Sequence, residues 1–160
     1  MEHITAYFDG EKLQCLVGAI SSVTLIAATI YFLFMDKAVL KGFAYSALPI
    51  SVLLLIICVS VILRTPGDID RVSNFYHETP KLIQTDEIPR MERVMNSFSI
   101  IKKVEIALFV IGLLIIVLFR QNELAIGIAI GLIVMSSLLY LFDHLAESRG
   151  EVYLRFLNSL

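Results

Sequence analysis

The sequence predicts an all-α polytopic membrane protein of one domain, residues 1–160, with four transmembrane helices and a small helical cytoplasmic layer. Three observations support this fold class. Hydrophobic residues make up 58% of the chain and charged residues only 18%, whereas soluble domains carry more charge and less apolar surface. The charges are gathered into a few blocks. Between those blocks lie four uncharged runs, each of which is a candidate for part or all of a membrane span.

The first two uncharged runs are long enough to cross a bilayer without help. They extend from Leu13 to Met35 and from Gly42 to Leu63, and a hydrocarbon core of about 30 Å needs roughly 20 helical residues. We therefore predict spans at about 13–35 and 42–63. Pro49 cannot supply the backbone donor that a helix would use there, which predicts a kink in the second span.

The third run is short and contains the most informative residue of the sequence. Ile106 to Phe119 rises only about 21 Å as a helix, so a crossing has to include residues before it. We predict a third span at about 100–119, with Glu105 inside it near the cytoplasmic edge. The fourth run predicts a span at about 124–142.

The water-exposed part of the chain is the segment 64–103 together with the tail 143–160. Pro66 and Gly67 predict a turn, followed by a short amphipathic helix that ends before Pro80. A second helix begins near Pro89 and continues into the third span. The tail predicts a cytoplasmic C-terminal helix placed to cover this loop. One apolar stripe on the second helix is a candidate interface for a protein partner: Ile88, Met91, Met95 and Phe98.

The distribution of basic residues predicts the orientation. Of the 13 Lys and Arg residues, ten fall on the side of the termini and the central loop, and three fall on the side of the two short hairpins. Because basic residues are enriched on the cytoplasmic side, both termini are expected in the cytoplasm.

Two interpretations of Glu105 remain open. It continues the helical face of Val94, Phe98 and Ile101, so it is expected to face other helices and not lipid. The favoured interpretation is a structural carboxylate paired with Lys102 or with Arg64, because the residue lies at the rim near cations. The other interpretation is a proton or cation site.

Gly127 and Gly131 form a small-xxx-small motif that predicts a close helix contact. The contact can lie within one chain or between two, which leaves an oligomeric role open. Cys15 and Cys58 lie within predicted spans and are interpreted as small apolar residues. The sequence predicts no catalytic residues, no metal site, no cofactor and no nucleic-acid partner. Its expected surroundings are the lipid bilayer and a protein partner or a second copy of the chain.

The second half of the chain carries a resemblance. "RTPGDIDRV" followed by "EIPRMERVMNSFSIIKKVEIALFVIGLLIIV" resembles a group of small uncharacterised bacterial four-span inner-membrane proteins. The resemblance implies a location in the bacterial inner membrane. By analogy, small proteins of this kind include candidates for immunity to toxins that act at the membrane.

Three function classes follow from these observations. The favoured one is a non-enzymatic protein that acts through protein–protein interaction, such as an immunity or accessory factor. The alternative is a small oligomeric channel or transporter with Glu105 at its cytoplasmic mouth. A membrane enzyme would need a nucleophile or metal cluster at the interface, and His77, Glu78 and Asp86 are too loosely spaced to suggest one.

Overall fold

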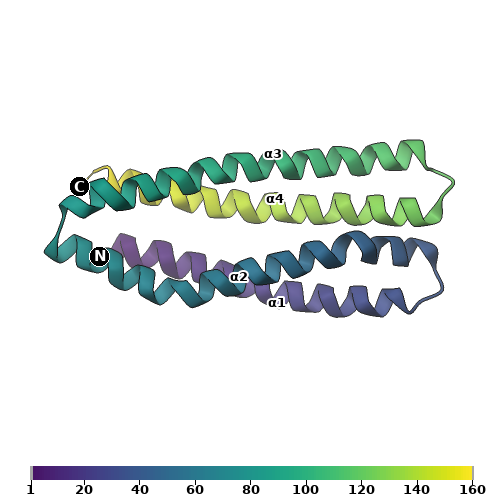
Figure 1. The fold of residues 1–160 in the computed structure, drawn as a ribbon, viewed down its shortest axis with the longest axis horizontal. Helices are drawn as coiled ribbons and strands as arrows, with labels where there is room; N and C mark the ends of the chain where they lie inside the picture. The colour runs from purple at the N-terminus through teal and green to yellow at the C-terminus, as the bar shows by residue number, and fades with distance from the viewer. Residues whose placement is uncertain (1, 160) are drawn as a thin grey trace.

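The computed structural model describes residues 2–159 of the chain, and the side chains of residues 4–159. It contains four long helices (Figure 1): α1 Glu2–Leu33, α2 Ala38–Glu78, α3 Ile88–Leu118 and α4 Glu123–Leu157. A short π-helical segment, η1 Ile83–Glu87, joins α2 to α3. Residues 2–159 contain no strand, so the predicted all-α class is confirmed.

The helices form two hairpins that lie side by side (Figure 1). α1 packs against α2, α2 packs against α4, and α4 packs against α3. The main contacts of α3 are with α4 and η1, so α3 is the outermost helix of the arrangement. The two short hairpin turns lie at one end of the molecule, and the two termini lie at the other. We call the end with the termini the polar end.

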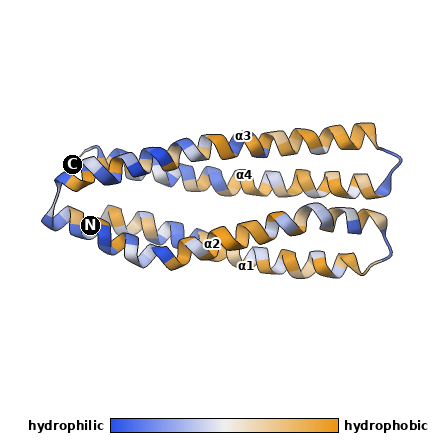
Figure 2. Ribbon diagram, in the orientation of Figure 1, coloured by the Kyte–Doolittle hydropathy of each residue, from blue (hydrophilic) through white to orange (hydrophobic). Residues whose placement is uncertain are grey.

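Three helices, α1, α2 and α4, are long and apolar enough to cross a membrane, as an integral membrane protein requires. The hydrophobic residues follow all four helices through the half that ends in the hairpin turns, while hydrophilic residues gather toward the polar end (Figure 2). α3 is not among the three helices because Lys102, Lys103 and Glu105 shorten its apolar stretch.

The predicted turn at Pro66 and Gly67 is wrong, because α2 continues through both residues to Glu78. A proline inside a helix removes one backbone hydrogen bond, and neighbouring contacts offset that loss. Val72 is fully buried against the other helices, and Asp68 forms ion pairs with Arg64 at 3.7 Å and with Arg71 at 3.1 Å. The predicted short helix is thus the last part of α2.

The polar end has a hydrophobic core of its own, to which every helix contributes. Tyr153 of α4 is stacked on Tyr7 of α1, with ring centroids 4.3 Å apart. The predicted C-terminal helix is the continuation of α4 and does not stand apart, and its residues pack on α2, η1 and the start of α3 as expected. The buried members of this core are Ile4, Phe8, Val72, Ile83, Met91, Tyr153 and Leu157.

The close contact predicted at Gly127 and Gly131 lies within one chain. A Cβ atom on Gly127 would be 3.0 Å from the Cα of Gly42 on α2, and a Cβ on Gly131 would be 3.0 Å from the carbonyl oxygen of Phe43. The Ser46 hydroxyl on α2 donates to the Ile128 carbonyl at 3.1 Å. The motif therefore holds the two hairpins together. Pro49 lies inside α2, and the kink expected there stays a prediction.

Candidate functional site

A cluster of charged side chains spans α3 and α4 where the apolar half meets the polar end. Lys102 on α3 donates from Nζ to the Glu147 carboxylate on α4. The same ammonium lies 3.5 Å from Nδ1 of His144 and 5.6 Å from the ring centroid of Tyr140, which is within the range of a cation–π interaction. Lys102 is therefore already engaged by α4.

Glu105 lies one turn further along α3 and is almost completely buried. Its side chain is only 3% exposed, and neither carboxylate oxygen has a hydrogen-bond partner among the described residues. The predicted pairing with Lys102 or Arg64 is not formed. Lys102 is bonded to Glu147, and Arg64 is paired with Glu11 at 3.1 Å and with Asp68. A buried carboxylate without a partner is costly.

The group that faces Glu105 is a second acid, Asp143 of α4. The two carboxyls lie within hydrogen-bonding reach of one another, and Lys102 is near enough to act on both electrostatically. Two ionised carboxylates can only accept hydrogen bonds, which explains why Glu105 has no donor. One proton between them would turn the same geometry into an O–H···O hydrogen bond. The arrangement is thus a carboxyl pair at the seam between α3 and α4, in which Glu105 is buried and Asp143 is partly buried.

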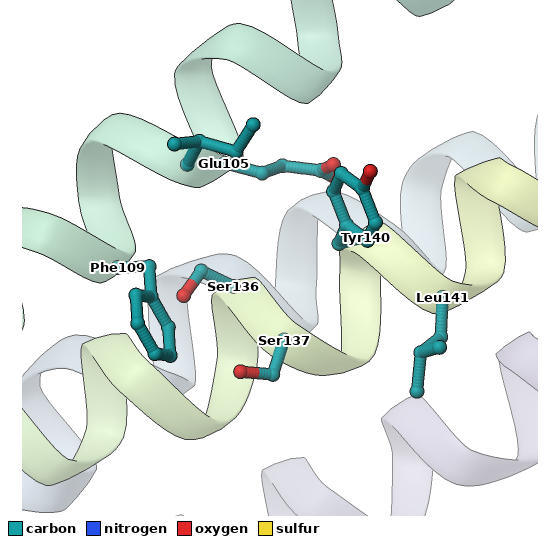
Figure 3. A pocket seen from close by; sticks show the side chains of 7 residues that line it. Glu105, Phe109, Ser136, Ser137, Tyr140 and Leu141 are labelled. Atoms are coloured by element: carbon teal, nitrogen blue, oxygen red, sulfur yellow. The ribbon is translucent and has the colours of Figure 1, made fainter.

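A pocket adjoins this pair on the same seam (Figure 3). It has a volume of about 460 Å³, and Glu105 extends from α3 toward the α4 side chains that form its other wall. Those walls are mostly apolar or aromatic. The Ser136 and Ser137 hydroxyls both donate to the Ile133 carbonyl. The lining residues are Glu105, Ile106, Phe109, Ser136, Ser137, Tyr140 and Leu141.

The apolar stripe that was a candidate partner interface faces the chain's own core. Met91 is fully buried and Ile88 packs against the polar-end core. Met95 fills the space beside Gly150, where a Cβ atom would lie 2.8 Å from its sulfur, and Phe98 is partly buried. Because these contacts use the stripe within the chain, we assign it to intramolecular packing.

Glu87 is a second buried acid, and it was not singled out from the sequence. It is 1% exposed and accepts hydrogen bonds from Arg90 at 2.6 and 2.9 Å and from the Tyr153 hydroxyl at 3.2 Å. Burial alone would lower the pKa of Arg90, but the hydrogen bond and charge of Glu87 raise it overall. This group is fully partnered, so it ties η1, α3 and α4 together as a structural network.

Asp143 was also missed from the sequence, because it lies one residue beyond the predicted fourth span. The antiparallel packing of α3 and α4 indicates which residue faces Glu105. Since Lys102 faces Glu147, a residue one turn later on α3 must face a residue one turn earlier on α4. Glu105 and Asp143 fit that register.

The fold and the site define the class of protein: an all-helical protein with three helices able to cross a membrane and a buried Glu105 on α3 that faces a second carboxyl on α4. Comparison with known proteins found no family model, no curated protein and no solved structure that matches the chain. Among the described residues, no group of three His, Cys, Asp or Glu side chains could hold a metal ion. The Glu105–Asp143 pair is therefore the structural feature that indicates a function.

Proposed function

We propose that this is an integral membrane protein whose Glu105–Asp143 pair reversibly binds a proton or another small cation between α3 and α4. The observation that carries the proposal is the burial of Glu105 without a hydrogen-bond partner opposite another carboxyl. Ionisable groups inside membrane proteins are expensive and commonly mark proton or ion sites. A channel or transporter would also need such a binding step, in which the pair takes up and releases the proton or cation.

The charge balance of the cluster supports cation binding. Glu105, Asp143 and Glu147 contribute three carboxyls to the seam, while Lys102 contributes one fixed positive charge and pairs with Glu147. Two facing carboxylates in a site of low polarity repel one another, and the usual resolution is that they share a proton. A cation of similar size would relieve the same repulsion.

We further propose that α3 is the fourth crossing. It runs antiparallel along the full apolar length of α4 (Figure 1), and its apolar stretch is completed by the residues around Glu105. In this arrangement the carboxyl pair lies at the inner edge of the bilayer, the polar end is cytoplasmic, and both hairpin turns are outside. The resemblance of the second half of the chain motivates placing the protein in a bacterial inner membrane.

Function through protein–protein interaction is a second candidate, because α4 is the only long helix against which α3 packs extensively. In the membrane, the side of α3 that faces away from α4 exposes large apolar residues, including Val110, Leu114 and Val117. A partner helix, or α3 of a second copy, would fit such a face better than it would fit the buried stripe. An immunity or accessory factor would act through this face.

The proton-binding proposal is tested by chemical modification with dicyclohexylcarbodiimide, a lipid-soluble reagent that attacks protonated carboxyls. We expect one molecule of reagent per chain at neutral pH, located by peptide mass spectrometry at Glu105 or Asp143. The water-soluble reagent ethyl-dimethylaminopropyl carbodiimide should label exposed acids instead. Glu123 is exposed near the outer turn, so Glu123→Gln is the matched control and should leave the lipid-soluble labelling unchanged.

The result that would contradict the proposal is equally specific. If neither Glu105 nor Asp143 reacts with the lipid-soluble carbodiimide while the protein remains folded, the pair holds no exchangeable proton. Loss of labelling in Glu105→Gln and in Asp143→Asn would show that both acids are needed to hold the proton.

A further inference from the structure

The pocket beside Glu105 combines features that a proton site alone does not need. Its volume of about 460 Å³ lies within the range of small-molecule sites, which is roughly 300 to 1,000 Å³. It lies on the α3–α4 seam, and several of its walls are exposed at the apolar surface, including Ile106, Phe109 and Leu141. A molecule dissolved in the bilayer can therefore reach it sideways.

The polar content of the pocket selects for positive charge. Glu105 lines it, and its two oxygens, which lack donors, are buried next to the pocket wall, where Glu105 also interacts with Asp143. The hydroxyls of Ser136 and Ser137 already donate to a backbone carbonyl, so they provide no free proton for an anion. Lys102 is bonded to Glu147. The negative charge of the Glu105 carboxylate next to the pocket wall therefore opposes a bound anion and favours a bound cation.

The aromatic walls add to this selection. Tyr140 already attracts one cation, the ammonium of Lys102, and Phe109 lies on the opposite helix. Aromatic faces attract cations through the ring quadrupole, more strongly where water is excluded. The remaining lining, with Ile106 and Leu141, suits an apolar body.

We propose that the α3–α4 pocket binds a lipophilic organic monocation that enters from the bilayer, with its positive centre at Glu105 and its apolar body against Phe109, Tyr140 and Leu141. This inference rests on the proposed function, because the bound cation takes the place of the proton on the carboxyl pair. The groups around Glu105 are then Tyr140 and Asp143 from α4, with Lys102 from α3, itself held by Glu147. The protein discriminates by charge at one end of the ligand and by apolar bulk at the other.

The probe for the experiment is tetraphenylphosphonium, a permanent monocation with an apolar shell. Tetraphenylborate has the same shape and the opposite charge, so it is the matched control. Binding is measured by isothermal titration calorimetry on the full chain in lipid nanodiscs, with empty nanodiscs subtracted. We expect saturable binding of the phosphonium at one site per chain and no saturable binding of the borate.

Substitutions in and around the pocket locate the site. Glu105→Gln should weaken phosphonium binding at least tenfold, which corresponds to about 1.4 kcal/mol, while Glu123→Gln should leave it unchanged. Phe109→Ala should weaken binding through loss of the aromatic wall. If Glu105→Gln does not fold, Asp143→Asn provides the same test, because it removes half of the negative charge without touching the pocket wall.

Protection experiments separate this inference from the proposed function. Phosphonium should protect Glu105 from the lipid-soluble carbodiimide, and prior modification should abolish phosphonium binding. Labelling of Glu105 without any phosphonium binding would overturn the ligand inference and leave the proton site standing. Equal binding of the phosphonium and the borate, or binding unaffected by both acid variants, would also overturn it. Absence of labelling would contradict the proton site itself.

Discussion

Lys102 on α3 is bonded to Glu147 on α4 and not to Glu105, which lies one turn away on the same helix. This choice of partner leaves Glu105 facing Asp143. We expect a double-mutant cycle of Lys102→Met with Glu147→Gln to give a coupling energy of about 1 kcal/mol, because both side chains are largely shielded from water. The measurement is equilibrium unfolding in detergent.

A second cycle serves as the comparison. Lys102→Met combined with Glu105→Gln should give a smaller coupling than the Glu147 cycle. Glu105→Gln alone should cost little stability, since the amide can donate a hydrogen bond to the Asp143 carboxylate in place of the shared proton. A coupling energy larger than that with Glu147, or a loss of about 3 kcal/mol or more in Glu105→Gln, would instead support the Lys102–Glu105 ion pair that the sequence predicts.

The glycines of α4 give a prediction about packing. Gly127→Leu should destabilise the fold by about 1 to 3 kcal/mol, because the added side chain meets the backbone of α2 at Val39 and Gly42. Since this contact lies within one chain, the oligomeric mass should not change. Gly67→Ala is the matched control: its Cβ meets nothing within 4 Å, and the higher helix propensity of alanine should stabilise α2 by up to about 1 kcal/mol. A change in oligomer size with unaltered stability in Gly127→Leu would move the contact to an interface between chains.

The network at Glu87 gives a prediction about the polar end. Glu87→Leu should destabilise the fold by about 3 to 5 kcal/mol, because the partly buried Arg90 guanidinium and the Tyr153 hydroxyl lose their acceptor. Tyr153→Phe should cost about 1 kcal/mol. Asp86→Asn, at the exposed neighbouring position, should stay within about 0.5 kcal/mol of the parent. Thermal unfolding monitored by circular dichroism measures all three, and a Glu87→Leu variant as stable as Asp86→Asn would contradict a structural role for the network.

The orientation is tested by cysteine accessibility in cells, in a background with Cys15 and Cys58 replaced by alanine. A thiol at Asn74, which is exposed near the end of α2, should be protected from an impermeant reagent. A thiol at Gln121, which is exposed in the turn between α3 and α4, should react. Labelling of Asn74 in intact cells would invert the proposed topology.

Most of the fold was predictable because the length of an apolar, uncharged run indicates whether a helix can cross a membrane. The four uncharged runs from Leu13 to Phe142 correspond to the four long helices. The turn at Pro66 and Gly67 was mispredicted because local turn propensity was outweighed by the burial of Val72 and the ion pairs of Asp68. Local sequence patterns predict structure least well where contacts between several helices determine it.

The site was only half predictable for a related reason. Glu105 was recognisable because a carboxylate inside an apolar run needs an explanation. Its partner was not, because the choice between Lys102, Arg64 and Asp143 depends on the register of α3 against α4. Whether Gly127 faces α2 or a second chain likewise depends on contacts that no single helix encodes. The stripe from Ile88 to Phe98 shows the same limit, since periodicity identifies an apolar face but not what covers it.

The central claim is that Glu105 and Asp143 share one exchangeable proton, and infrared difference spectroscopy tests it most directly. A protonated carboxyl has a carbonyl stretch well separated from that of a carboxylate, so raising the pH of reconstituted protein should remove one such band. We predict that this band is present in the parent and in Glu123→Gln, and absent in both Glu105→Gln and Asp143→Asn. A band that survives in both acid variants, or a parent spectrum in which no such band changes with pH, would contradict the account.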